Sequence, residues 1–127
     1  MEFRKEWISN QLDASAIQWA EEKGRDYASI LTTSQIRKFF GALRGLELKA
    51  DENQQQLLLL KPKLAYAIAR IKKKPENKNN QPKLDKFFEE FGKALDSVQV
   101  ANKQTLNNFI GLFEAFVAYH KFHGGRD

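Results

Sequence analysis

Apolar residues recur every three or four positions through most of this chain, the spacing that places side chains on one face of an α-helix. The pattern is strongest in the second half, where the apolar positions are Leu84, Phe87, Phe88, Phe91, Leu95 and Val98, followed by Leu106, Phe109, Ile110, Phe113, Phe116 and Val117. No segment shows sustained alternation of apolar and polar residues, so no strand is expected. The sequence therefore predicts an all-α fold, a single-domain bundle of about five helices over residues 1–127.

Capping residues mark the starts of two helices in the first half of the chain. Asp13 is expected to cap a helix that Gly24 then ends. Thr32 and Gln35 have the spacing of a capping box, in which each side chain bonds the backbone amide of the other residue. This second signal predicts a helix that begins near Thr33.

Three other segments have a less certain local structure. Residues 1–12 form either a further short helix or an N-terminal arm, docked or flexible. Pro62 either kinks a helix over residues 54–73 or opens a new one, because proline lacks the amide donor that a helix interior needs. Two prolines bracket a polar run at residues 75–82, which predicts a loop, with Pro82 near the first turn of the next helix.

The composition excludes several classes of protein. The chain has no cysteine, which excludes disulfides and cysteine chemistry and fits a reducing compartment. Its first residues lack the apolar run of a signal peptide, and no apolar stretch is long enough to cross a membrane. We therefore expect a soluble cytoplasmic protein that makes no contact with a membrane.

The residue types that commonly carry catalysis or bind metals are sparse. His120 and His123 are three positions apart, but no carboxylate lies near them in the sequence, so charge near a helix C-terminus explains them better than a metal site. The adjacent acids of residues 21–22 and 89–90 point in different directions on a helix and are expected to be solvated. We expect no catalytic residue, no metal site, no cofactor and no enzymatic activity.

The positive charge of the chain is concentrated in one segment. The net charge is +5, and residues 61–83 hold eight basic residues and one acidic residue. On a helix, Lys63, Tyr66, Arg70, Lys73 and Lys74 lie opposite the apolar face, Lys61 flanks the core side, and Arg37, Lys38 and Arg44 belong to the preceding helix. Clustered lysine and arginine side chains can neutralise phosphates, and tyrosine can stack on a base. These nine residues are candidates for RNA binding, if the two helices are neighbours; a solvated charged face is the simpler explanation.

The segments LTTSQIRKFFGAL and KPKLAYAIAR, in this order, resemble the small subunit of type III-A CRISPR effector complexes, the Csm complexes. The runs TTSQIRKF and KLAYAIAR carry the resemblance, and the motifs span about a third of the chain. The small subunit of the type III-B (Cmr) complexes is similar in size and helicity and stays an alternative. A second alternative is a helical protein-interaction module that has no RNA role and whose basic face binds acidic protein.

The resemblance implies a non-catalytic subunit in antiviral defence. Several copies would stack into the minor filament along the guide RNA. The implied partners are guide RNA, target RNA and the other subunits of the effector complex, with self-association along the filament or as a homodimer. The implied RNA contacts are Arg37, Lys38, Lys61, Lys63 and Arg70.

Overall fold

The computed structural model describes residues 1–47 and 54–126, and these residues form helices and no strand. The helices are α1 (Glu6–Ser9), α2 (Ala14–Tyr27), α3 (Thr33–Glu47), α4 (Gln54–Leu58), α5 (Leu60–Lys72), the 3-10 helix η1 (Pro75–Asn80), α6 (Gln81–Asp96) and α7 (Lys103–Phe122). Five of the α-helices have 13 residues or more. The all-α prediction is confirmed, and the predicted count of about five helices is close.

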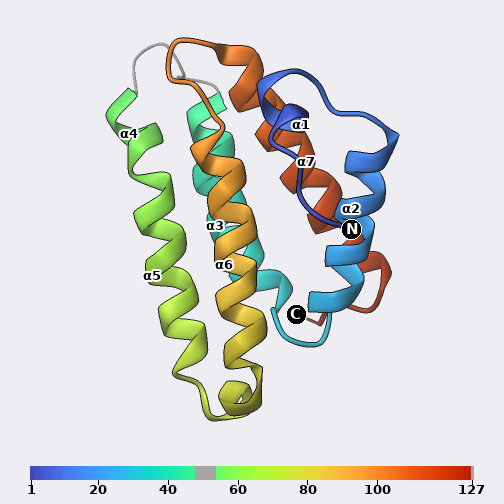
Figure 1. Cartoon of the computed structure of the whole chain (residues 1–127). Helices are drawn as coiled ribbons and strands as arrows, with labels where there is room; N and C mark the ends of the chain where they lie inside the picture. Colours follow the sequence, from blue (N-terminus) through green and yellow to red (C-terminus); the bar gives the residue numbers. More distant parts are fainter. Residues whose placement is uncertain (48–53, 127) are drawn as a thin grey trace.

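The long helices pack in two groups around a common core. Figure 1 shows α5 and α6 side by side, joined at one end by η1, with α3 behind them. On the other side, α7 packs against α2 and α3. No helix in the described part of the chain is long and apolar enough to cross a membrane.

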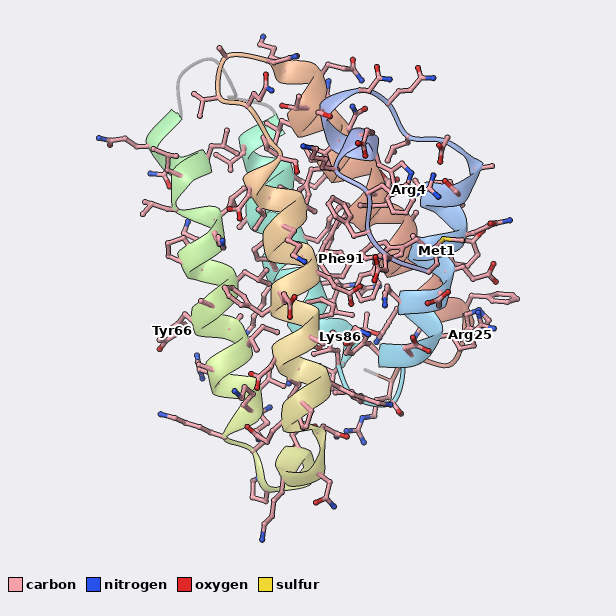
Figure 2. The ribbon with its side chains drawn as sticks, viewed as in Figure 1. Met1, Arg4, Arg25, Tyr66, Lys86 and Phe91 are labelled. Carbon is pink, nitrogen blue, oxygen red and sulfur yellow. The ribbon has the colours of Figure 1, made fainter. Side chains whose placement is uncertain are left out.

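Rings of phenylalanine and tryptophan fill the centre of the bundle. Phe91 of α6 lies inside it (Figure 2), with its ring centroid 5.3 Å from Trp19 of α2 and 5.1 Å from Phe116 of α7. Phe113 of α7 lies 5.6 Å from Phe91 and 5.3 Å from Phe39 of α3. One ring cluster therefore joins α2, α3, α6 and α7.

Both predicted caps are present in the structure. Asp13 accepts a hydrogen bond from the amide of Ala16 at 2.9 Å. The amide of Gln35 donates to Thr32 Oγ1 at 3.1 Å, and the amide of Thr32 donates to Gln35 Oε1 at 2.9 Å. These reciprocal bonds satisfy two donors that the helix itself leaves unpaired, and α3 begins at Thr33 as predicted.

The N-terminal residues are a docked segment that contains the short helix α1. Trp7 and Ile8 are almost fully buried. Asn108 of α7 donates from Nδ2 to the carbonyl oxygens of Ile8 at 2.9 Å and Asn10 at 3.1 Å. The structure therefore combines the two forms that the sequence allowed for residues 1–12, because the short helix α1 lies within an arm that is docked on α7.

Pro62 lies in the first turn of α5, which begins at Leu60 after α4 has ended at Leu58. The first turn of a helix leaves its amides without partners inside the helix, so a missing donor costs little there. Of the two alternatives for Pro62, the structure therefore has a proline near the start of a new helix.

The predicted loop at residues 75–82 is instead a 3-10 helix that continues directly into α6 at Gln81. Asn77 is buried and donates from Nδ2 to the Ile71 carbonyl at 3.0 Å. Gln81 donates from Nε2 to the Lys72 carbonyl at 2.6 Å. These side chains satisfy carbonyls at the end of α5, which explains why a polar run forms an ordered connection.

Gly24 does not end α2, which continues to Tyr27. A Cβ atom at this position would lie 2.6 Å from the backbone nitrogen of His120 in α7. The glycine therefore serves a close approach of two helix backbones, a constraint that comes from a residue far away in the sequence.

One of the four expected solvated acids, Glu90, is partly buried. Lys23 Nζ lies 3.1 Å from Glu90 Oε1, and the side chains are only 6% and 12% exposed. The ammonium also lies 5.6 Å from the centroid of the Trp19 ring. The prediction of solvated acids is wrong for Glu90, because burying Lys23 against the ring requires a partner for its charge.

We predict that Thr32→Ala lowers the free energy of unfolding by about 1 kcal/mol, the usual cost of a lost N-cap. The Gln35 amide would lose its acceptor, while the buried side chains of α3 stay in place. Thermal or denaturant unfolding measures the change. An unchanged midpoint would show that the capping box contributes nothing to stability.

We predict that Gly24→Ala lowers the free energy of unfolding by about 1–3 kcal/mol, the cost of overpacking a tight contact, although alanine favours a helix. The matched control is Gly41→Ala on α3, where a Cβ atom meets nothing within 4 Å. That change should raise the stability by up to about 1 kcal/mol through helix propensity alone. Equal effects of the two substitutions in a denaturant titration would contradict the close approach of α2 and α7.

Candidate functional site

A groove between α3 and α5 gathers much of the predicted basic set. It has a volume of about 260 Å³ and will be called the α3–α5 groove. From α5 it is lined by Lys63, Ala67, Arg70, Ile71 and Lys74, and from α3 by Gln35, Lys38, Phe39 and Ala42. Each of these α5 residues lies three or four positions from another of them, so one stripe of the helix faces α3.

The rim of the groove carries positive charge from both helices. The cations Lys38, Lys63, Arg70 and Lys74 are exposed, and no carboxylate is among the lining residues. Within the part of the chain that the structure describes, none of the four makes an ion pair. The groove therefore presents four uncompensated cations to solvent, which favours an anionic ligand.

The two lysines on the other flank of α5 are neutralised within the chain. Lys61 Nζ lies 2.9 Å from Asp96 Oδ2 of α6, and Lys72 pairs with Asp85 of the same helix. The structure thus excludes the candidate Lys61 from the groove, although its surface position leaves the carbon stem half exposed. The face of α5 toward α6 has Lys61 and Lys72 in ion pairs, whereas the face toward α3 has cations without a carboxylate partner among the described residues.

Tyr66 lies on the outer side of α5 and is not among the residues that line the groove, while Lys73 is exposed and lines the surface between α5 and α6. Tyr66 is 67% exposed and projects away from the bundle (Figure 2). The Arg70 guanidinium lies 5.9 Å from the centroid of its ring, a cation–π distance. These side chains extend the basic surface outward from the groove.

Arg37 and Arg44 lie on the opposite flank of α3, toward α7. Arg44 is 3.7 Å from Glu114 of α7, and its guanidinium lies 5.8 Å from the centroid of the Phe40 ring. Arg37 is seven residues before Arg44 and therefore shares its flank. The helices α3 and α5 are neighbours, as the prediction required, but these two arginines are not brought to the groove.

Sequence reasoning missed the uncharged residues of the groove. Phe39 and Ile71 are buried core residues, while Ala42 and Ala67 leave space above them because their side chains are small. Lys63, Ala67 and Ile71 are each four positions apart, so helical periodicity alone could have placed the small residue Ala67 on the same face of α5 as Lys63. The position of Ala42 in the groove cannot be predicted from the sequence, because it depends on the packing of α5 beside α3.

A second groove, between α2, α6 and the N-terminal residues, has the opposite charge. Its volume is about 540 Å³, and its acidic lining residues are Glu2, Glu22, Asp26, Asp85, Glu89 and Glu90. Lys23, Lys86 and Lys93 also line it. The two grooves therefore differ in charge, because the α3–α5 groove is lined by cations without carboxylates and this second groove is lined by six carboxylates and three lysines.

The two histidines have separate partners. His120 is buried, with Nε2 2.6 Å from the Leu31 carbonyl oxygen, and burial is the main cause that lowers its pKa. His123 Nε2 lies 3.2 Å from Glu21 Oε2. In residues 1–47 and 54–126, no group of three or more histidine, aspartate or glutamate side chains could hold a metal ion.

Comparison with protein families gives one match for this chain. The family model described as Csm2 Type III-A matches residues 9–126. Comparisons with curated proteins and with solved structures give no match. The match covers nearly the whole chain and agrees with the type III-A resemblance rather than with the type III-B alternative.

We predict that acidification destabilises the protein through His120. The pKa of His120 is lower in the folded state than its unfolded value of 6.5, so folding favours the neutral ring. The contribution of the neutral ring to the free energy of unfolding is complete above pH 6.5. It is lost as the pH falls through the lower pKa of the folded state. The free energy of unfolding should therefore decrease between about pH 7 and about pH 5.5, before most carboxylates titrate.

The variant His120→Gln keeps a donor for Leu31 but cannot ionise, so its stability should depend less on pH in this range. His123→Gln is the control, since this ring lies near the surface. Denaturant titrations at each pH measure the effect. Equal pH dependence in the wild type and His120→Gln would show that another group titrates.

Proposed function

Because the chain belongs to the Csm2 Type III-A family, the small subunits of type III-A CRISPR effector complexes, we propose that it binds the RNA backbone through the α3–α5 groove. The observation that carries the proposal is the separation of charges on α5. Lys61 and Lys72 are paired with carboxylates of α6, whereas the four cations of the groove make no ion pair among the described residues. Unpaired cations on one surface can release the counterions of several phosphates.

The proposed ligand follows from the chemistry of this surface. Lysine and arginine contacts to phosphate carry no base information, so binding should depend little on sequence. A subunit that serves many different guides needs this property. Tyr66 and Lys73, beside the groove, would extend the contact along a strand.

The proposal includes the assembly in which the subunit acts. The partners are guide RNA, target RNA and the other subunits of the effector complex, and copies associate along a filament or as a homodimer. The acidic groove at α2 and α6 supports a protein contact, because it offers a surface of opposite charge to the α3–α5 groove. The subunit acts in antiviral defence without catalysing a reaction.

We predict that replacing Lys63, Arg70 and Lys74 by alanine weakens RNA binding and its salt dependence. The slope of log K against log salt concentration should fall by about 0.7 for each lost contact to a single strand, so by roughly 2. Fluorescence anisotropy with single-stranded RNA at several salt concentrations measures the slope. Helical content and melting temperature should stay near wild type, because all three side chains are exposed and none belongs to the core.

The matched control removes the same charge elsewhere, by replacing Arg4, Arg25 and Lys86 with alanine. All three are exposed, and Figure 2 shows Arg4 and Arg25 on the side of the molecule away from Tyr66. The control should keep nearly the wild-type slope. If both triple variants lose the same slope, diffuse charge rather than the groove explains binding; if polyglutamate competes as well as RNA at fixed salt, the surface docks acidic protein.

We predict no cleavage of single-stranded RNA in the presence of Mg²⁺ or Mn²⁺. The described residues hold no cluster of metal ligands, and both histidines have structural partners. Gel analysis of labelled RNA after incubation with purified protein is the test. Cleavage that persists through purification and is abolished by one substitution would refute the non-catalytic role.

A further inference from the structure

The α3–α5 groove has a floor that phosphate binding alone does not require. Phe39 and Ile71 line it, and the Phe39 ring is held in the core by Phe113 at a centroid distance of 5.3 Å. Ala42 and Ala67 stand on the two walls, where larger side chains would fill the 260 Å³ volume. Phosphate groups are strongly hydrated and gain nothing from an apolar floor, so the groove suits a ligand that also has an apolar part.

The four cations stand around this floor on both walls, Lys38 on α3 and Lys63, Arg70 and Lys74 on α5. A ligand that satisfies both features is a flat apolar group joined to anions on either side. A nucleobase on its sugar–phosphate chain has this arrangement. A base inside a duplex is paired and stacked, so the ligand that the groove can receive is an unpaired nucleotide.

The capping box fixes one polar group at this groove. Gln35 lines it, and its Oε1 accepts the hydrogen bond from the Thr32 amide at 2.9 Å. Because a backbone amide can bond only the oxygen of this side chain, the Gln35 NH₂ group remains, and within the described residues it has no acceptor. A donor held in this way can bond a carbonyl oxygen or a ring nitrogen on the edge of a base.

We propose that the α3–α5 groove receives an unpaired nucleobase of the bound RNA, with the base over Phe39 and Ile71 and the flanking phosphates near the four cations. This inference rests on the proposed RNA-binding function and adds to it a site for the base. The sequence preference stays weak, because every base has an apolar face and Gln35 offers a donor that all four bases can use.

The test fills the groove without changing its charge. Ala67→Leu and Ala42→Leu are two independent variants from opposite walls, so the proposal remains testable if one of them unfolds. The control is Ala69→Leu, because Ala69 is exposed on α5 and faces the α6 side instead. Each protein is titrated with a single-stranded oligoribonucleotide and with the same sugar–phosphate chain without bases, at several salt concentrations.

The two wall variants should bind the single-stranded RNA about ten-fold more weakly than wild type, the range of a lost base contact. Their salt slope should be unchanged, and their affinity for the baseless chain should equal that of wild type. Ala69→Leu should bind both ligands as wild type does.

Three results would overturn the inference, each in a recognisable way. If wild type binds neither ligand, the proposed RNA function fails and the base site fails with it. If wild type binds both ligands equally and the wall variants do too, the RNA function stands and the base site is wrong. If an acidic peptide with a phenylalanine binds as tightly as RNA and is equally sensitive to Ala67→Leu, the groove receives a protein side chain.

Discussion

The ring cluster around Phe91 is the interaction on which the rest of the bundle depends. Phe91 meets rings from α2 and α7, and Phe113 continues the cluster to Phe39 of α3. Four helices therefore share one set of close aromatic contacts, which are favourable beyond the area they bury. Helix α5 contributes no ring to this cluster; its buried residues are aliphatic, and its one aromatic residue, Tyr66, faces solvent. The helix is an outer layer that packs on a core formed by the others.

This peripheral position explains how α5 can pack on the bundle with one face and remain open for the proposed binding with another. Toward α6 it is held by ion pairs of Lys61 and Lys72 and by the side chains that cap its last turn. Toward α3 it presents Ala67 instead of a large side chain, so the two helices leave a groove between them. Cations on that side make no ion pair within the described structure, so their charge is available to the anionic ligand that we propose. The contacts that stabilise α5 and the cations that we propose for recognition thus lie on different faces of one helix.

The features that sequence reasoning found are local ones. The helical period, the cap at Asp13 and the Thr32–Gln35 box each depend on residues within a few positions of one another, and the structure contains all of them. The misreadings concern contacts between distant segments. Gly24 resembles a helix stop until α7 lies against it. For Lys61 the RNA contact stays a prediction, and its ion pair with Asp96 is a distant contact that the sequence does not reveal. Charge and helical periodicity nominated nine candidate residues, but the packing of α3 against α5 determines which of them line the same groove.

The packing of the N-terminal segment on α7 also has a consequence for how the chain acquires its structure during synthesis. Asn108 bonds the carbonyl of Ile8 across 100 positions of sequence, and α2 rests along α7. Helical proteins usually fold quickly because most of their contacts are local. Here the first helices leave the ribosome long before α6 and α7 exist. Until then Trp19 lacks its ring contact with Phe91, although Phe3 and Trp7 are already available to pack beside it. The docking of the N-terminal segment on α7 must therefore follow the synthesis of the last helix, and until then Trp7 and Trp19 lack part of the apolar surface that buries them in the folded protein.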